Sequence, residues 1–311
     1  MLKDFINICR MTQDELLRII PVILSKSYDD VDATDDYIYA VGDIPVMLVA
    51  HLDTVHKNQP LNIWLSLDKD KIMAEEGIGG DDRCGVYSIL RVIKSGYKPY
   101  VLFTTDEEIG GIGASKFCDK YSSLPVNCFI ELDRKGSNDC VRYEDENEDL
   151  TNQFSKYGFK EAFGSFTDIC ILSDTYKISG VNLSVGYYNQ HTNSEYVIMS
   201  ELNNTITKVM DFLVDKSNYE HKYEYKNDIR NKYNIYGDYY LNRKYPCCCD
   251  ICGNKIDLFK MNETPDGAMC DECYSIYESQ YITCPLCGEL TYADDSICEW
   301  CGFEIGDDDS V

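Results

Sequence analysis

Hydrophobic residues in the first 215 positions follow two patterns, short continuous apolar runs and longer stretches with helical spacing. Residues 44–51 and 100–105 are runs of strand length, typical of strands buried on both faces of a mainly parallel sheet. Residues 12–25 begin with Thr12 as a helix N-cap, carry acids in the first turn and space their apolar residues as an amphipathic helix does. The same criteria predict further strands at 37–41, 126–133 and 180–187, a hairpin at 61–76, and helices at 86–94, 114–121 and 200–214.

This alternation of strands and helices predicts an α/β fold, which we expect to be a three-layer α/β/α sandwich around a mostly parallel mixed sheet. Ligands of such folds bind at the carboxyl ends of the strands. Polar residues with side chains that can bind ligands lie at these predicted strand ends, so we expect a functional site at this edge of the sheet.

The composition changes near residue 215. Residues 1–215 are the expected α/β domain, and residues 216–245 are rich in Tyr, Asn and Lys with weak periodicity. We interpret this second segment as either a linker or a strap that packs over the core. Residues 246–311 contain ten of the sixteen cysteines and end in an acidic tail, residues 306–311, that we expect to be disordered.

The charge balance narrows the range of partners. A net charge of −25 does not suit a protein that binds nucleic acid through its phosphates, which requires clustered Lys and Arg. No run approaches the roughly 18 apolar residues of a membrane span. The first residues lack the apolar core of a signal peptide, so we expect a cytoplasmic protein.

Five short segments carry the residue types that a pair of bridged divalent cations requires. Two of the four histidines fall within them, next to carboxylates that follow apolar runs. Hydrolysis by two metals needs a bridging carboxylate, terminal ligands and a free base together. The segments are His51-Leu-Asp53, Gly80-Asp81-Asp82, Asp106-Glu107-Glu108, Leu132-Asp133 and Gln190-His191-Thr192.

The spacing of residues within these segments suggests which of them bind metal and which support or assist the ligands. His51 and Asp53 lie two residues apart at a strand end, so their side chains point to the same side. One of them can bind a metal while the other accepts the remaining imidazole N–H. Glu107 and Glu108 can diverge after the turn, one as a ligand and the other as a general base.

Three further acids are candidates. Either Asp81 or Asp82 can supply a bridging carboxylate from its glycine-rich loop, and Asp133 is a candidate terminal ligand at the end of its strand. Asp168 is a weaker candidate, equally a supporting acid or an ordinary turn residue.

These segments resemble the zinc-dependent exopeptidase superfamily with co-catalytic metals, which includes leucyl-type aminopeptidases, peptidase T and glutamate-type carboxypeptidases. The resemblance covers roughly residues 45–197 and keeps the family order. It rests on His51-Leu-Asp53, Gly79-Gly-Asp-Asp-Arg-Cys-Gly85, Glu107-Glu-Ile-Gly-Gly-Ile-Gly-Ala114, Asp133 and His191-Thr-Asn-Ser-Glu195.

The resemblance implies a role for each residue. His51 and Asp133 would be the terminal ligands of one metal, and Glu108 and His191 those of the other. Asp81, the first aspartate of its pair, would bridge them. Asp53 would orient His51, and Glu107 would be the general base for a hydroxide shared by the metals. The implied cofactors are two catalytic divalent cations, zinc with manganese or cobalt as alternatives.

Spacing sets this chain apart from the larger members of the superfamily. Only 29 residues separate His51 from Asp81 and 57 separate Asp133 from His191, too few for the inserted domains of those enzymes. The layout is closest to that of monomeric aminopeptidases. We therefore predict a metallopeptidase, an aminopeptidase acting on a peptide or small amide. The alternatives are an amidase or deacylase of a small acylated compound and a non-catalytic interaction protein with a peptidase fold.

The cysteine-rich region predicts two structural zinc ions in four-cysteine zinc ribbons, because its Cys-x-x-Cys pairs have zinc-ligand spacing. Residues 246–311 carry two lysines, no arginine and fifteen acids, and this net charge of −13 disfavours nucleic acid. The expected role is contact with a protein or covering of the active-site mouth. Cys247 and Cys248 are spare, which leaves the register open by one residue. The predicted ligands are Cys249, Cys252, Cys270 and Cys273 for one ion and Cys284, Cys287, Cys298 and Cys301 for the other.

Overall fold

The structure is a computed structural model that describes residues 2–143, 145–164 and 166–226, together with short segments of the C-terminal region. The chain divides into two compact units, Met1–Asn227 and Asp228–Val311, and each is described by itself. The C-terminal segments are residues 247–248, 255–256, 262–264, 267–279, 281–283 and 290–292.

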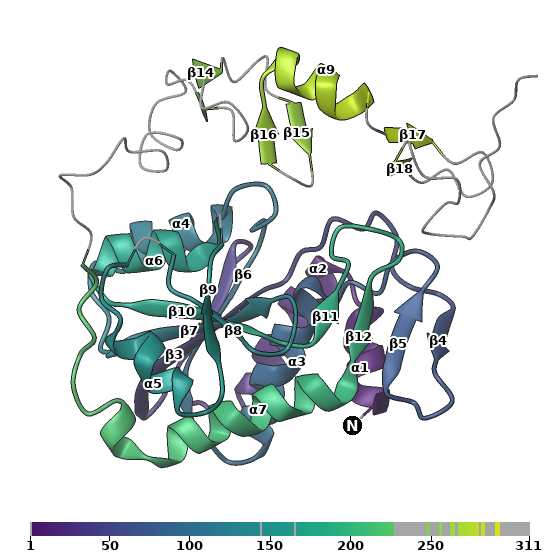
Figure 1. The fold of residues 1–311 in the computed structure, drawn as a ribbon. Helices are drawn as coiled ribbons and strands as arrows, with labels where there is room; N and C mark the ends of the chain where they lie inside the picture. Colours follow the sequence, from purple (N-terminus) through teal and green to yellow (C-terminus); the bar gives the residue numbers. More distant parts are fainter. Residues whose placement is uncertain are drawn as a thin grey trace, which may run out of the picture. The chain divides into compact units, whose positions relative to one another are not determined.

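An eight-stranded mixed sheet forms the centre of the first unit (Figure 1). Its strand order is β1-β2-β6-β3-β7-β10-β8-β9, and the four central strands β6, β3, β7 and β10 run parallel. The strands are β1 (Val31–Ala33), β2 (Tyr37–Ala40), β3 (Ile44–His51), β6 (Pro99–Thr104), β7 (Cys128–Arg134), β8 (Asp139–Val141), β9 (Lys160–Ala162) and β10 (Gly180–Ser184).

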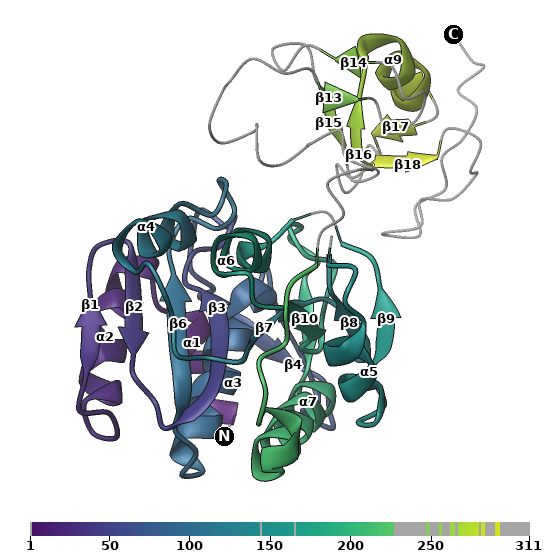
Figure 2. The same ribbon diagram turned by 90° about the vertical axis from the view of Figure 1, so that its left-hand side faces the viewer.

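Helices pack on both faces of this sheet, and Figure 2 shows its strands side by side from β1 to β9. Residues of β3 alternate between the two cores: Val46 and Leu48 join a cluster with α1, α2, α3, α5 and α7, whereas Met47 and Val49 join one with α4 and α6. The predicted three-layer sandwich is therefore confirmed. The helices are α1 (Leu2–Cys9), α2 (Gln13–Leu24), α3 (Gly80–Lys94), α4 (Ile112–Lys120), α5 (Asp149–Ser155), α6 (Asp168–Tyr176), α7 (Met199–Val214) and the short 3-10 helix η1 (Lys216–Asn218).

A second, antiparallel sheet of four strands has the order β11-β12-β5-β4. Its β4–β5 pair is the hairpin predicted at 61–76. The connection between β11 and β12 carries His191. The strands are β4 (Ile63–Leu65), β5 (Lys71–Ala74), β11 (Tyr187–Tyr188) and β12 (Tyr196–Ile198).

Local signals account for several element ends. Thr12 is the N-cap of α2, as predicted, and it forms a capping box with Glu15. Helix α3 begins at Gly80, earlier than expected, but Asp81 and Asp82 have non-helical backbone angles, so the regular helix starts after them. Asp168 is the first residue of α6 rather than an ordinary turn residue. The sequence pattern also did not predict α1, α5, α6, β1, β8, β9 or β12.

The chain after α7 stays on the surface of the first unit as far as residue 226. Tyr219 and Tyr223 are buried there, and the Tyr223 backbone N–H donates to the carbonyl of Asn127 at 2.8 Å. The described part of the Tyr-rich segment therefore packs against the first unit, and residues 227–246 lie outside the described residues.

The second unit contains three two-stranded sheets and one helix among its described residues. Cys270 follows β16, and Cys273 lies in the first turn of α9. The other six predicted zinc ligands lie outside the described residues. Across the described parts of both units, none of the helices combines the length and apolar character that a membrane span requires. The elements are β13 (Cys247–Cys248), β14 (Lys255–Ile256), β15 (Asn262–Thr264), β16 (Gly267–Met269), α9 (Asp271–Ser279), β17 (Tyr281–Thr283) and β18 (Leu290–Tyr292).

Candidate metal centre

Five segments that are distant in sequence meet at the carboxyl ends of the parallel strands. His51 is the last residue of β3, and Asp133 lies near the end of the neighbouring strand β7. Asp81 enters from the start of α3, Glu108 from the turn after β6, and His191 from the loop between β11 and β12. The parallel arrangement brings the strand ends to one edge, which is why these residues are neighbours.

The carboxylate of Asp81 lies between the two imidazoles. Its Oδ1 is 3.0 Å from Nε2 of His51, and its Oδ2 is 3.2 Å from Nε2 of His191. Nε2 of each imidazole also lies near one further carboxylate. Asp133 Oδ1 lies 3.5 Å from His51 Nε2, and Glu108 Oε1 lies 3.0 Å from His191 Nε2.

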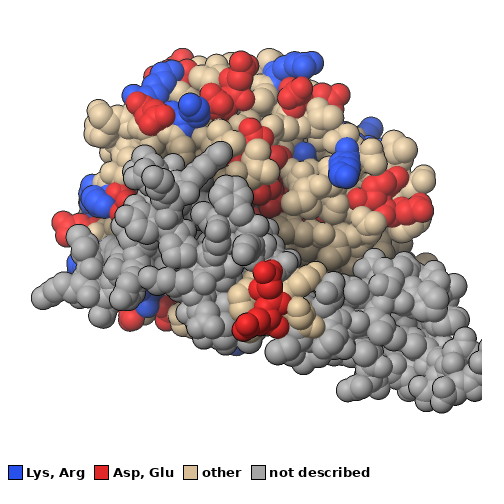
Figure 3. Space-filling model, turned by 90° about the horizontal axis from the view of Figure 1, so that it is seen from above, with Lys and Arg blue, Asp and Glu red and all other residues tan. Residues whose placement is uncertain are grey.

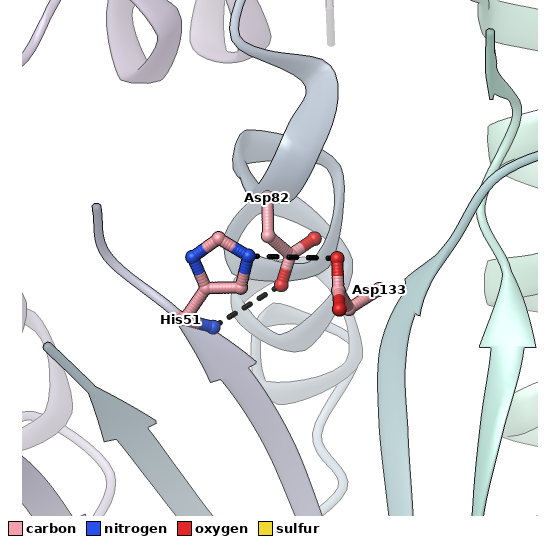
Figure 4. Close-up of side chains that lie close together, drawn as sticks. All are labelled: His51, Asp82 and Asp133. Atoms are coloured by element: carbon pink, nitrogen blue, oxygen red, sulfur yellow. Dashed lines mark hydrogen bonds and ion pairs between the residues drawn. The ribbon is translucent and has the colours of Figure 1, made fainter. Parts of the chain in front are cut away.

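Asp81 and Asp82 differ in what their oxygens contact. Asp82 forms one possible ligand group with His51 and Asp133 (Figure 4), whereas Asp81 forms another with His51 and Glu108. Both oxygens of Asp82 accept backbone N–H groups, from His51 at 3.2 Å and from Gly85 at 2.7 Å. Its oxygens are therefore committed to the main chain, and Asp81 is the better candidate for a bridging ligand.

Asp53 connects the first imidazole to the turn after β6. Its Oδ1 lies 3.1 Å from Nδ1 of His51 and accepts the N–H of Glu107, and its Oδ2 accepts the N–H of Glu108 at 3.0 Å. One carboxylate thus fixes the ring of His51 and the backbone that presents both glutamates. An acceptor on Nδ1 leaves Nε2 free to bind a cation.

Glu107 is a buried carboxylate that is not one of the candidate metal ligands. Burial raises its pKa well above the usual range, and the nearby charges of Asp133, Asp168 and Glu131 act in the same direction, against the opposing effect of His51. A carboxyl group that holds a proton more readily than usual is suited to general acid–base catalysis.

The carboxylates of the centre lie close together, and their charges raise the pKa values of several groups there. Burial opposes protonation of His51, but Asp53 and Asp133 outweigh it and raise its pKa well above the usual range. Hydrogen bonds to Asp81 and Glu108 raise the pKa of His191 to about 10. Burial and the charge of Asp81 raise the pKa of Asp133 to about 7. These groups therefore bind protons more readily than usual, because a proton reduces the repulsion between the carboxylates. Bound cations would reduce the same repulsion.

The donor set fits divalent metals of the zinc type. Each candidate position offers one imidazole nitrogen and carboxylate oxygens, the ligands that Zn²⁺ binds. In the two possible ligand groups the donor atoms all lie within 4.8 Å of one another. Acidic side chains set deep in the surface are also visible in the middle of the face drawn in Figure 3.

Two buried acids beside the centre were missed or underrated by the sequence analysis. Glu131 shares a face of β7 with Asp133 and accepts a hydrogen bond from Thr167 at 2.5 Å. Asp168 accepts one from Thr104, and burial raises its pKa to about 6. The alternation of β7 could have revealed Glu131, because residues two apart on a strand face the same side.

Arg83 is a further positioning group that the sequence did not reveal. Its side chain is 1% exposed, yet it donates to main-chain carbonyls of Leu52 at 2.6 Å and Asp53 at 3.1 Å. It therefore binds the loop after β3 to the start of α3, the two segments that carry His51 and Asp81.

No protein-family model matches the chain, and no curated protein matches its sequence. Solved structures do share its fold. A tripeptidase from Staphylococcus aureus superposes with a TM-score of 0.56 at 15% identity, covering 68% of this chain and 96% of the tripeptidase. The aminopeptidase PepT from Bacillus cereus gives a TM-score of 0.56 at 13% identity, covering 69% and 97% of the two chains.

An aminopeptidase from Desulfurococcus kamchatkensis gives a TM-score of 0.53 at 12% identity, covering 68% of this chain and 94% of its own. Identities this low establish the fold alone. The chain therefore has the α/β fold of these peptidases, the fold expected from its resemblance to the co-catalytic zinc exopeptidases.

Proposed function

We propose that this chain is a metal-dependent hydrolase that cleaves an amide or peptide bond, and that it acts as an aminopeptidase. The observation that carries the proposal is the position of Asp81. Its two oxygens lie 3.0 and 3.2 Å from Nε2 of His51 and of His191, which is the arrangement a bridging carboxylate requires. The peptidases that share the fold support the same class of reaction.

The ligands divide into two sets. His51 and Asp133 would hold one cation, Glu108 and His191 the other, and Asp81 both. Two bound cations, zinc or alternatively manganese or cobalt, would polarise the substrate carbonyl and lower the pKa of the attacking water.

The residues of the chain supply the proton transfers. Glu107 would take the proton of the attacking water and return it to the leaving amine. Its burial and raised pKa support this role, because a base that binds a proton well can also return it. Asp53 would keep Glu107 in place through the backbone N–H that it accepts at 3.1 Å.

Two other functions have distinct signatures. An amidase or deacylase would use the same centre on a small acylated compound. A non-catalytic interaction protein with a peptidase fold would have no need for a base, so the presence of Glu107 beside all five proposed ligands favours an enzyme.

A substrate panel separates these functions. Purified full-length protein with added zinc is assayed against aminoacyl amides with a free α-amine and against the matched N-acyl amides. An aminopeptidase cleaves the first series and spares the second, whereas a deacylase shows the opposite preference. Cleavage of neither series, under zinc, manganese or cobalt, contradicts the proposed hydrolase.

The cysteine-rich unit is proposed to be structural. Two zinc ions bound by the four Cys-x-x-Cys pairs would stabilise it, since closed four-thiolate sites have no open position for a substrate. The division into a catalytic domain at 1–215, the Tyr-rich segment at 216–245 and two zinc ribbons at 246–311 belongs to the same proposal. The net charge of −13 on residues 246–311 favours a protein partner over nucleic acid.

A further inference from the structure

Glu195 is a fully buried carboxylate at the end of the loop that carries His191, four residues after that histidine. It makes three polar contacts, and all of them lead to other loops. Its Oε2 accepts the backbone N–H of Gly79 at 2.8 Å and lies 2.8 Å from Nε2 of His56, and its Oε1 accepts the backbone N–H of Asp81 at 3.0 Å.

His56 lies on the loop that follows β3, after His51 and Asp53. Its side chain is buried, and its ring lies against Gly77, where an added Cβ would come within 2.1 Å of the imidazole. Gly77 also has a φ of +86°, a conformation that favours glycine. The ring is therefore held in a fixed place, with its Nε2 directed at Glu195.

These contacts join the three loops that present His51, Asp81 and His191. The hydrogen bond from Asp81 is the important one, because it fixes the main chain of the residue whose side chain lies between the two imidazoles. The loop from 189 to 194 is otherwise half-buried or exposed, and His191 itself is 50% exposed. The hydrogen bonds of Thr192 to Asn189 and Ser194 stay within this loop, whereas those of Glu195 join it to the backbone of the Asp81 loop.

A role in packing alone would be met better by an apolar side chain. The side chain of Glu195 is 0% exposed, and burying a carboxylate costs free energy unless hydrogen-bond donors offset the loss of water. The space around it is also close-packed, since a Cβ on Gly80 would lie 3.2 Å from Glu195 Oε1.

We propose that Glu195, held by His56, is a positioning residue that fixes Asp81 relative to His191 and so determines how tightly the centre holds the cation between Asp81, Glu108 and His191. The inference rests on the proposed function, because it presumes that the centre binds two cations. Groups that orient metal ligands typically change metal affinity by about 10- to 100-fold when they are removed.

The test compares zinc affinity in four variants of the full-length protein, measured by competition with a chromophoric chelator. Glu195→Gln places an amide where two backbone donors and an imidazole need acceptors, and it should weaken binding of one zinc equivalent by about 10- to 100-fold. His56→Leu removes the contact to Glu195 and should act in the same direction. His56→Gln offers an N–H donor again and should recover most of the affinity.

Glu201→Gln is the matched control. Glu201 accepts a hydrogen bond from Tyr188 at 2.6 Å, close in sequence to the same loop but without a contact to the Asp81 loop. It should keep wild-type zinc affinity. Circular dichroism of the zinc-free proteins identifies any variant that fails to fold, and if Glu195→Gln does so, the two His56 variants carry the test.

The outcomes are separable. Wild-type affinity for the two zinc equivalents that depend on His51 and His191, in both Glu195→Gln and His56→Leu, overturns the inference, and so does an equal loss in Glu201→Gln. If the wild-type protein binds no zinc that depends on His51 or His191, the proposed function itself fails, whatever the variants do.

Discussion

The side chains of the centre differ in how firmly the fold holds them. His51 is completely buried and contacts three carboxylates, whereas the side chain of His191 is 50% exposed. The first proposed metal position is thus built into the core of the sheet, and the second proposed position is completed by a surface loop. We expect cations to leave the position of His191 first, because less structure must move to release them.

Replacing the proposed base is the sharpest test at this scale. Glu107→Gln keeps the size of the side chain but removes its ability to take a proton, so turnover should fall by about 10²- to 10⁴-fold. Metal content should stay at the wild-type value, since Glu107 is not a proposed ligand. Asp106→Asn is the control: Asp106 neighbours Glu107 but accepts a hydrogen bond from Gln13. Undiminished hydrolysis in Glu107→Gln removes the base assignment.

Acid groups of the centre also predict how stability depends on pH. In the metal-free protein the pKa of Asp133 is raised to about 7 and that of Asp168 to about 6, so the native state keeps protons that the unfolded chain releases. The raised pKa values of His51 and His191 act in the same direction. The free energy of unfolding should therefore fall as pH rises from about 5 to about 7, by about 1–2 kcal/mol.

Urea unfolding with chelator present, at a series of pH values, measures this dependence. Saturating zinc should reduce it, because the bound cations replace the protons. A metal-free protein that becomes more stable as pH rises over this interval would show that the acids are not crowded as described.

At the scale of elements, α7 covers one face of the central sheet through Phe212. This side chain is fully buried and stacks on Phe154 of α5, with ring centroids 4.6 Å apart. Phe212→Ala should lower the free energy of unfolding by about 3–5 kcal/mol. Val214→Ala on the same helix, where the side chain is 63% exposed, should change it by no more than about 0.5 kcal/mol. Equal urea midpoints for the two variants would contradict this packing.

The elements that the sequence predicted are those with a strong local signal. The strand that ends at His51 and the helix capped by Thr12 are examples, because a continuous apolar run and a capping box are both visible within a few residues. Helix α6 was missed because its nine residues include Ile, Thr and a low proportion of strong helix formers, so packing of Ile169 and Leu172 against the sheet decides its structure.

The same distinction holds for the site. His51, Asp81 and Glu107 stand out because each lies at the end of an apolar run or in a glycine-rich loop. The contacts of Glu195 were not predictable, since its partners Gly79 and Asp81 lie 116 and 114 residues away and only the fold brings them together.

The whole molecule combines a compact α/β unit with a small cysteine-rich unit, in a chain of net charge −25. Clustered acids in and around the centre account for part of this charge, and they would attract a substrate with a free ammonium group more than one with a free carboxylate. This favours the amino end of a peptide and agrees with the proposed aminopeptidase.

The central claim is that two imidazoles and three carboxylates hold a pair of cations. Anomalous X-ray diffraction from crystals of the zinc-loaded full-length protein, recorded on both sides of the zinc absorption edge, tests it directly. We predict one zinc peak on each side of the Asp81 carboxylate. One peak should lie next to His51 and Asp133, and the other next to Glu108 and His191. The absence of zinc from this position, or a single peak bound by neither histidine, would contradict the account.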